Sequence, residues 1–357
     1  MYKPSAIRSV WRSIPVLAAA LAPLWGCGQA GGGGPIEVAI TGEDEVRQGI
    51  GFTPTPQPDQ LVFVDGWTLK FERWLTVIGG VRLNQPGRDP AQQQIVGAAV
   101  ATRSGPWVVD LTQADTIPLT RFERADDGSG FDTQVRYAFS FDLAPAQASV
   151  TRVNLDAADE PALATMIQRG YSNYAEVVAT HAPYTAGDDP VFQSYPTTVR
   201  FSLGWGGTVS YLNCENPDNG TDGQSNRGVQ PRQDASRSAT IHMHIEHPFW
   251  ETLNTENPPL RFDPIAARAT TQLMGSERTG TVAIDDLDGA FVSRLTDGAG
   301  SPVPDRCALT GCQRKSGALA YNPMGASGVE TLKKFMIYSA QSMAHLNGEG
   351  LCYVQRK

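Results

Sequence analysis

The chain has 357 residues and a formal net charge of −8 at pH 7, with 36 glycines and 25 prolines. A chain of this length buries a sizeable core, and its acidity favours cations as ligands and excludes nucleic acid as a natural partner. The high share of glycine and proline predicts many turns and short strands.

The first 26 residues have the pattern of an export signal. Lys3, Arg8 and Arg12 precede an apolar stretch over residues 13–25, and no acidic residue lies among them. The stretch is shorter than the ~20 residues that a membrane-spanning helix needs. A basic start and a short apolar core predict a signal peptide over residues 1–26.

The stretch Leu24-Trp25-Gly26-Cys27 resembles the lipobox of bacterial lipoproteins. The resemblance implies cleavage before Cys27 and attachment of the mature chain to a membrane through a lipid on that cysteine. Gly28 stands where an aspartate favours inner-membrane retention in enteric bacteria, so the resemblance implies the outer membrane, with the side that the chain faces left open. An ordinary signal peptide with a chance cysteine is the alternative.

The rest of the chain divides into a linker and a folded part. Residues 27–58 contain the glycine-rich stretch "GQAGGGGP" directly after Cys27 and are expected to form a flexible tether. Residues 59–357 are expected to form a single β-rich domain. The alternative is a sandwich over residues 59–150 with an extension over residues 151–357.

Alternating apolar and polar residues predict half-buried antiparallel strands. The alternation occurs over residues 67–71, 75–83, 105–111, 135–143 and 198–205. Glu72 and Arg73 interrupt the pattern after the first of these stretches, which predicts a bulge or bend there.

Three helices are predicted, over residues 159–169, 263–273 and 328–347. The last is marked by a capping box formed by Ser327 and Glu330. Together with the strands, these helices predict a mainly β protein of the α+β class. Its core is expected to be an antiparallel β-sandwich with a few packed helices.

Four cysteines remain besides Cys27, and an even number in an exported chain predicts two disulfides. The favoured pairs are Cys307 with Cys312, which closes a short loop, and Cys214 with Cys352, which ties the C-terminus to the middle of the chain. A thiolate metal site is the alternative, although the C-x4-C spacing has no second such pair.

The stretch "IHMHIEHPFW" over residues 241–250 contains His242, His244 and His247. In a strand over residues 238–246, an apolar stripe faces the core, and the first two histidines share the other face. His-x-His on a strand supplies two nitrogen ligands for copper or zinc. His247 precedes a proline where the strand must end, so a turn can bring it back as a third ligand.

Further ligands could come from Glu246, Glu251, His181 or His345. The competing interpretation is a strand whose histidines lie on a solvated face and bind nothing. The nucleophile elbow, the Walker A loop, the dinucleotide fingerprint and the haem attachment motif are missing from the sequence. No enzymatic activity is therefore predicted.

The strand order over residues 59–145 resembles that of β-sandwich domains of bacterial lipoproteins, among them the MbnP-like copper-associated family. The whole chain also resembles myxobacterial-type lipoproteins with an "HPFW" segment and a "GLCYV"-like C-terminus, which implies no mechanism. We expect a lipid-anchored lipoprotein of the cell envelope that binds copper or zinc without catalysis. The alternative is a structural or accessory surface lipoprotein without metal, which serves an outer-membrane transporter or another envelope partner.

Overall fold

The structure is a computed structural model of the chain. The residues it describes are 32–357 apart from 90, 183–188, 220–226, 234, 275–276 and 313–316. The predicted signal peptide, Cys27 and the first residues of the predicted tether lie outside the described residues.

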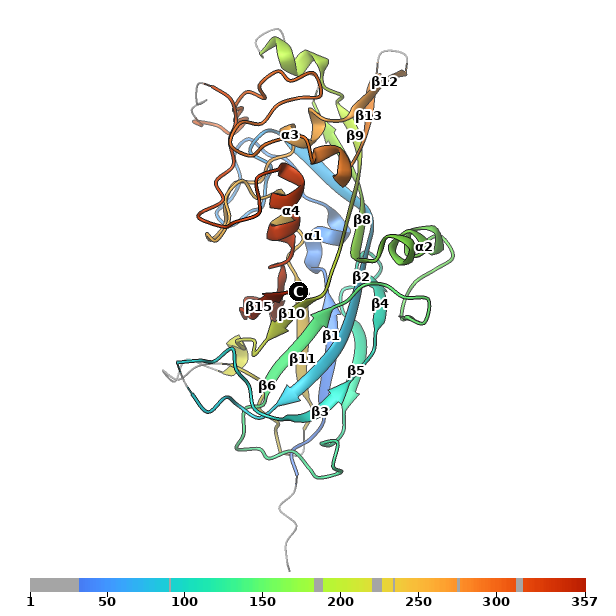
Figure 1. The fold of residues 1–357 in the computed structure, drawn as a ribbon, viewed down its shortest axis with the longest axis vertical. Helices are drawn as coiled ribbons and strands as arrows, with labels where there is room; N and C mark the ends of the chain where they lie inside the picture. Colours follow the sequence, from blue (N-terminus) through green and yellow to red (C-terminus); the bar gives the residue numbers. More distant parts are fainter. Residues whose placement is uncertain are drawn as a thin grey trace, which may run out of the picture. The chain divides into compact units, whose positions relative to one another are not determined.

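A four-stranded mixed sheet joins segments from both ends of the chain (Figure 1). Its strands, in spatial order, are β14 (Ala344–Leu346), β11 (Arg237–Met243), β1 (Ile36–Thr41) and β5 (Ile117–Phe122). β11 runs parallel to β1 and antiparallel to β14. This sheet therefore places the beginning, the middle and the end of the chain side by side.

The first described residues form regular secondary structure. Ile36, Val38 and Ile40 of β1 are buried, and α1 (Glu43–Gln48) follows the strand directly. The prediction of a flexible tether over residues 27–58 is therefore wrong for these two elements. The alternation of apolar residues in β1 is short and directly follows a glycine-rich stretch, so the sequence alone did not indicate a strand there. The strand is stabilised by pairing with β11, which lies far along the chain.

An eleven-stranded sheet contains the remaining strands. They are β2 (Trp67–Asn84), β3 (Ala99–Arg103), β4 (Trp107–Asp110), β6 (Ala138–Leu143), β7 (Thr151–Arg152), β8 (Tyr171–His181), β9 (Thr198–Gly206), β10 (Val209–Leu212), β12 (Thr270–Met274), β13 (Glu277–Ala283) and β15 (Tyr353–Arg356). The register of β2 against β8 shifts between Phe71 and Arg73, which confirms the predicted bulge. Strands from both sides of residue 150 pair in this one sheet.

The mainly β, α+β class is confirmed, and the sheets contain parallel pairs besides antiparallel ones. β9 and β13 run parallel, as do β1 and β11. Short 3-10 helices connect several strands, namely η1 (Pro190–Ser194), η2 (Pro217–Asn219), η3 (His247–Phe249) and η4 (Ile284–Leu287).

Two of the three predicted helices are shorter than expected. α2 (Glu160–Arg169) agrees with its prediction, but α3 (Asp263–Ala266) ends after four residues instead of reaching residue 273. The residues that follow enter β12, whose threonines are β-branched and pair with β13. Sheet pairing therefore replaces the second half of the predicted helix.

The third helix, α4 (Leu332–Ala340), occupies only the middle of the predicted range 328–347. Gly328 has a φ of +74°, which a right-handed helix does not allow, so the predicted capping box of Ser327 and Glu330 is not the helix start. Thr331 is the N-cap instead, and its side chain accepts from the backbone N–H of Lys334. β14 takes up the C-terminal part of the predicted helix.

The apolar core lies on both faces of the large sheet. Figure 1 shows α2 on one side of β2 and β8, and α1, α3 and α4 on the other side. Leu163 and Met166 of α2 pack against Leu75 and Val77 of β2 in a small cluster. The main cluster fills the other face and includes the apolar residues of the four-stranded sheet.

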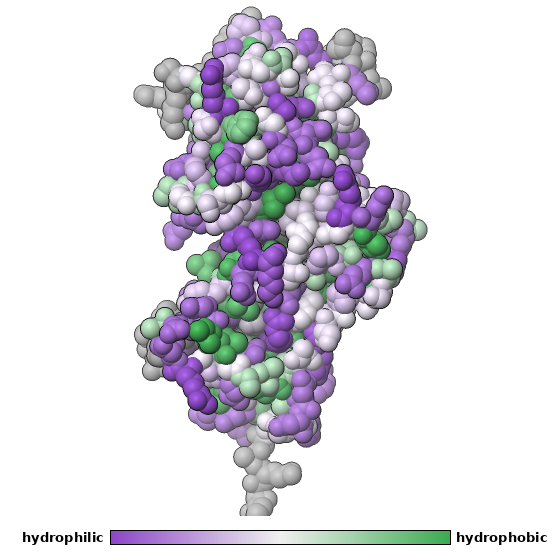
Figure 2. All heavy atoms as spheres, in the orientation of Figure 1, coloured by the Kyte–Doolittle hydropathy of each residue, from purple (hydrophilic) through white to green (hydrophobic). Residues whose placement is uncertain are grey.

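Polar side chains cover most of the face shown in Figure 2, and apolar side chains appear there in small separate groups. None of the helices in the described part of the chain is long and apolar enough to cross a membrane.

Candidate metal centre

Four of the five histidines of the chain meet where β11 pairs with β14. His242 and His345 stand opposite each other in the register of the two strands. The ring of His244 lies 4.3 Å from that of His345 and 5.8 Å from that of His247, centroid to centroid. The strand pairing therefore joins the three predicted histidines to a fourth.

The local sequence explains why the predicted histidines converge. Ile241 and Met243 of β11 are buried in the core, so His242 lies on the opposite face, as the alternation predicts. The strand ends at Met243, three residues before the predicted end at Glu246. η3 then turns the chain, and the imidazole of His247 comes back towards the other rings.

Two glutamates alternate with these imidazoles. The Glu43 carboxylate has one oxygen 2.9 Å from Nδ1 of His242 and the other 3.6 Å from Nδ1 of His244. Oε1 of Glu246 lies 3.7 Å from Nδ1 of His244 and 3.9 Å from Nε2 of His247. Imidazole and carboxylate groups thus follow one another along one connected row.

A third glutamate lies near His345. Oε2 of Glu349 lies 3.9 Å from Nδ1 of His345. His244, His345 and Glu349 each have one ligand atom that lies within 4.8 Å of the ligand atoms of the other two. Glu349 is exposed, whereas the two histidines are buried. This group combines two nitrogen ligands and one oxygen ligand in a place that solvent can reach.

Hydrogen bonds fix which nitrogen of His247 can bind a metal. The hydroxyl of Ser342 donates its single proton to the carbonyl of Ser339 at 2.7 Å. It must therefore accept from His247, whose Nδ1 lies 3.1 Å away. The lone pair of the neutral ring is then on Nε2, which faces Glu246, and such a bond to the other nitrogen is typical of metal-binding histidines.

Burial keeps the inner histidines neutral. Burial, together with repulsion from nearby His244, lowers the pKa of His345 to about 3. Burial also lowers the pKa of His247 well below its usual value, with His345 as the next cause. Nδ1 of His345 is buried and has no hydrogen-bond partner. Neutral imidazole is the form that coordinates metals.

The glutamates respond to the same environment in different ways. Burial raises the pKa of Glu246 to about 7. Burial also acts to raise the pKa of Glu43, but the hydrogen bond from His242 and the neighbouring imidazoles outweigh it, and the net pKa is lowered. The site therefore holds at least one carboxylate whose negative charge is disfavoured until a positive charge lies next to it.

Several other buried or half-buried carboxylates have arginine partners. Asp263 forms two bonds with Arg306, and Glu251 pairs with Arg261. The four histidines described above and the glutamates Glu43, Glu246 and Glu349 are called the cluster from here on. Among the ion pairs of the described residues, none joins these three glutamates to a lysine or an arginine. The cluster thus lacks the cation that balances negative charge elsewhere in the fold.

Two of the further candidate ligands are placed elsewhere. Glu251 is occupied by Arg261, and the ring of His181 at the end of β8 lies against that of Trp67 at 5.2 Å. Glu43 and Glu349 were missed in the sequence analysis. Glu349 follows His345 by four positions, a spacing that could have indicated it, whereas Glu43 lies in the segment assigned to the tether.

Both predicted disulfides are confirmed, Cys214 with Cys352 and Cys307 with Cys312. The first holds the segment that follows Glu349. The backbone N–H of Glu215 also donates to the carbonyl of Leu351 at 2.8 Å. The loop that carries Glu349 is therefore held by β14 on one side and by the disulfide on the other.

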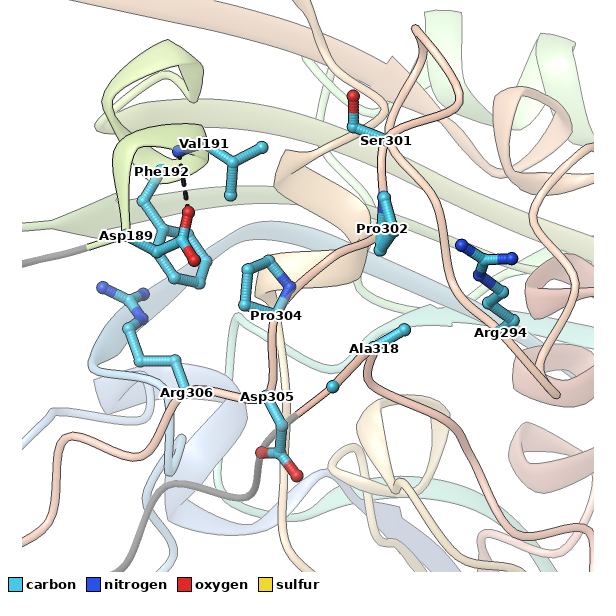
Figure 3. Close-up of a pocket in the computed structure, with 11 residues that line it drawn as sticks. Asp189, Val191, Phe192, Arg294, Ser301, Pro302, Pro304, Asp305, Arg306 and Ala318 are labelled. Carbon is cyan, nitrogen blue, oxygen red and sulfur yellow. Dashed lines mark hydrogen bonds between the residues drawn. The ribbon is translucent and has the colours of Figure 1, made fainter.

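A cavity of about 770 Å³ (Figure 3) is lined by none of the cluster residues. The guanidinium of Arg306 lies over the ring of Phe192 there, at 4.7 Å, and Arg294 lies on the other side of the view. Asp305 in its wall pairs with Arg261 at 2.9 Å. These partners belong to the buried arginine–carboxylate network, which indicates a structural role.

Comparisons of the chain with protein-family models, with curated proteins and with solved structures found no match.

Proposed function

We propose that the protein binds a transition metal, copper or zinc, without catalysis, through His244, His345 and Glu349. The observation that carries this proposal is the convergence of their ligand atoms within 4.8 Å of one another. Ligands about 2.0–2.2 Å from a tetrahedral zinc ion are separated by roughly 3.3 Å. Small side-chain rotations bring three atoms within 4.8 Å to that separation.

His247 is the best-placed fourth ligand, because its Nε2 carries the lone pair and its ring lies 5.7 Å from that of His345. Imidazole nitrogen and carboxylate oxygen suit zinc and copper(II). This proposal revises the predicted set of His242, His244 and His247, because it adds His345 and Glu349. It leaves out His242, whose Nδ1 lies 2.9 Å from the carboxylate of Glu43.

The proposal includes export and anchoring to the outer membrane through a lipid on Cys27. Its support is the lipobox resemblance, together with the two disulfides, which persist in oxidising compartments outside the cytoplasm.

Metal analysis of untagged, full-length protein tests this proposal. The protein is loaded with Zn²⁺ or Cu²⁺, desalted and analysed by mass spectrometry for bound metal. Wild type and a His181→Gln control, changed outside the cluster, are expected to retain metal. A His244→Ala/His345→Ala variant is expected to lose it.

Equal metal content in wild type and in the double variant would overturn the proposal. If the double variant does not fold, as judged by circular dichroism, Glu349→Gln replaces it. That side chain is 83% exposed, so the fold should tolerate the change. Unchanged affinity in this variant would then contradict the assigned ligand set.

A further inference from the structure

The three proposed ligands differ in their access to solvent. The side chains of His244 and His345 are each 9% exposed, whereas that of Glu349 is 83% exposed. The neighbouring side chains of Glu246 and His247 are buried as well. Of the three ligands, Glu349 is therefore the one that a second molecule can reach directly from solvent.

The backbone of the loop that carries Glu349 is fixed. Leu346 and Gly350 form two backbone hydrogen bonds with each other, of 2.9 and 3.1 Å, which close the loop between them. The backbone N–H of Asn347 donates to the carbonyl of Thr240 at 2.8 Å, and its side-chain oxygen accepts from the N–H of the same threonine at 2.8 Å. The loop is thus held against β11.

The carboxylate of Glu349, in contrast, is held weakly. In the part of the chain that the structure describes, no hydrogen bond involves it, and its one ion pair is the contact with Nδ1 of His345 at 3.9 Å. Exposed side chains change rotamer on the picosecond-to-nanosecond timescale. This carboxylate can therefore turn between the cluster and solvent while the backbone stays in place and no hydrogen bond is lost.

Two buried imidazoles and one mobile carboxylate favour a particular route for metal release. Without another molecule, the ion leaves only when its bonds to both imidazoles and to Glu349 have all broken. Zinc can expand its coordination from four to five ligands in a transition state. A nitrogen ligand from another molecule can therefore bind the ion before the carboxylate leaves, and the ion stays coordinated throughout the exchange.

We infer that the protein donates its metal to a second molecule by direct ligand exchange at Glu349. This inference rests on the proposed function, because it concerns the same three ligands. The partner is a metal acceptor that presents imidazole ligands, which suit both zinc and copper(II). A lone pair of the incoming imidazole forms a bond to the ion, and the bond to the Glu349 carboxylate breaks. The carboxylate keeps its electron pair and turns into solvent, so neither ion nor ligand is oxidised or reduced.

Transfer kinetics on the full-length protein test this inference. Zinc-loaded protein is mixed in a stopped-flow instrument with increasing excess concentrations of pyridylazoresorcinol, a chelator with nitrogen and oxygen ligands whose zinc complex is coloured. The transfer rate is expected to rise in proportion to the chelator concentration, because the chelator takes part in the slow step. A rate that does not depend on the chelator concentration means that zinc leaves first, and it overturns the inference.

A change of ligand at Glu349 tests where the exchange occurs. Glu349→His keeps a third ligand but replaces the carboxylate with an imidazole, which is displaced less readily, so the second-order rate constant is expected to fall about tenfold. Glu330→His is the matched control, since that side chain is 61% exposed and pairs with Lys334, and its rate constant should equal that of wild type.

The remaining outcomes separate the inference from the proposed function. An unchanged rate constant in Glu349→His overturns exchange at this residue. If Glu349→His retains no zinc, Glu349→Gln replaces it, and its rate constant is expected to rise, because a neutral amide is displaced more readily than a carboxylate; an unchanged value again overturns the inference. If wild type retains no zinc, the proposed function itself is wrong.

Discussion

Replacing Glu246 with glutamine is expected to stabilise the metal-free protein and to weaken its metal binding. Glu246 is only 8% exposed, and burial raises the pKa of its carboxyl group to about 7 from 4.5. One pKa unit corresponds to about 1.4 kcal/mol, so ionisation of this group costs the folded protein up to ~3 kcal/mol above pH 7. A neutral glutamine avoids this cost but leaves an amide in the same place, which costs about 1 kcal/mol.

The expected net effect of Glu246→Gln is a gain of about 2 kcal/mol in the free energy of unfolding at pH 8. The sign follows from linkage: the folded pKa lies above the unfolded one, so the penalty is absent below about pH 4.5 and complete above about pH 7. The advantage of the variant should therefore grow with pH across this window. With zinc present the order should reverse, because the variant has lost the negative charge next to His244 and His247.

Urea unfolding of wild type and variant at pH 4.5 and pH 8, in chelator and in zinc, measures these differences. Glu349→Gln is the control, since its exposed carboxylate should change the metal-free stability by less than about 0.5 kcal/mol. A loss of stability in metal-free Glu246→Gln at pH 8, or a difference that does not depend on pH, would refute the reasoning.

The disulfide and the N-cap give two further predictions. Changing Cys214 and Cys352 to alanine should weaken zinc binding roughly tenfold, because the loop that carries Glu349 loses one of its supports, whereas removing the other disulfide should leave zinc affinity unchanged. Calorimetric titration compares the two, and equal affinities would contradict this role. Thr331→Ala should lower the free energy of unfolding by about 1 kcal/mol and Ser327→Ala by almost nothing, as measured by urea unfolding. If Ser327→Ala lowered the free energy of unfolding more than Thr331→Ala did, the helix would begin at Ser327, as predicted from the sequence.

The sequence was most informative where the signal is local. The alternation in β2 predicted both a strand and its bulge, and the alternation around His242 predicted which face the histidines share. The turn before Pro248 was enough to predict that His247 leaves the strand. Each of these predictions depends on neighbours within a few positions, where side-chain direction follows from strand geometry.

The missed parts depend on pairing between distant segments. β1 is a short run of alternating apolar and polar residues that follows a glycine-rich stretch. Only its pairing with β11 and β5 shows that it belongs to a sheet. Glu43 enters the site through that pairing. His345 was a candidate ligand from the sequence, but the strand β14 that places it lies within a predicted helix. The second half of the predicted helix after Asp263 likewise became a strand beside β13. Tertiary pairing overrides local propensity at each of these places.

The central place of β1 between β11 and β5 also determines when the proposed metal site can form. β1 is made early by the ribosome, yet its parallel partner β11 is made roughly two hundred residues later, and β14 later still. Long-range pairings of this kind form slowly, since the intervening chain must first be ordered. The growing chain therefore does not have the proposed metal site during synthesis, and the site can form only after nearly all of the residues are available. If the chain is exported before it folds, as we propose, it arrives without metal, and the metal that it binds is the one available at its destination.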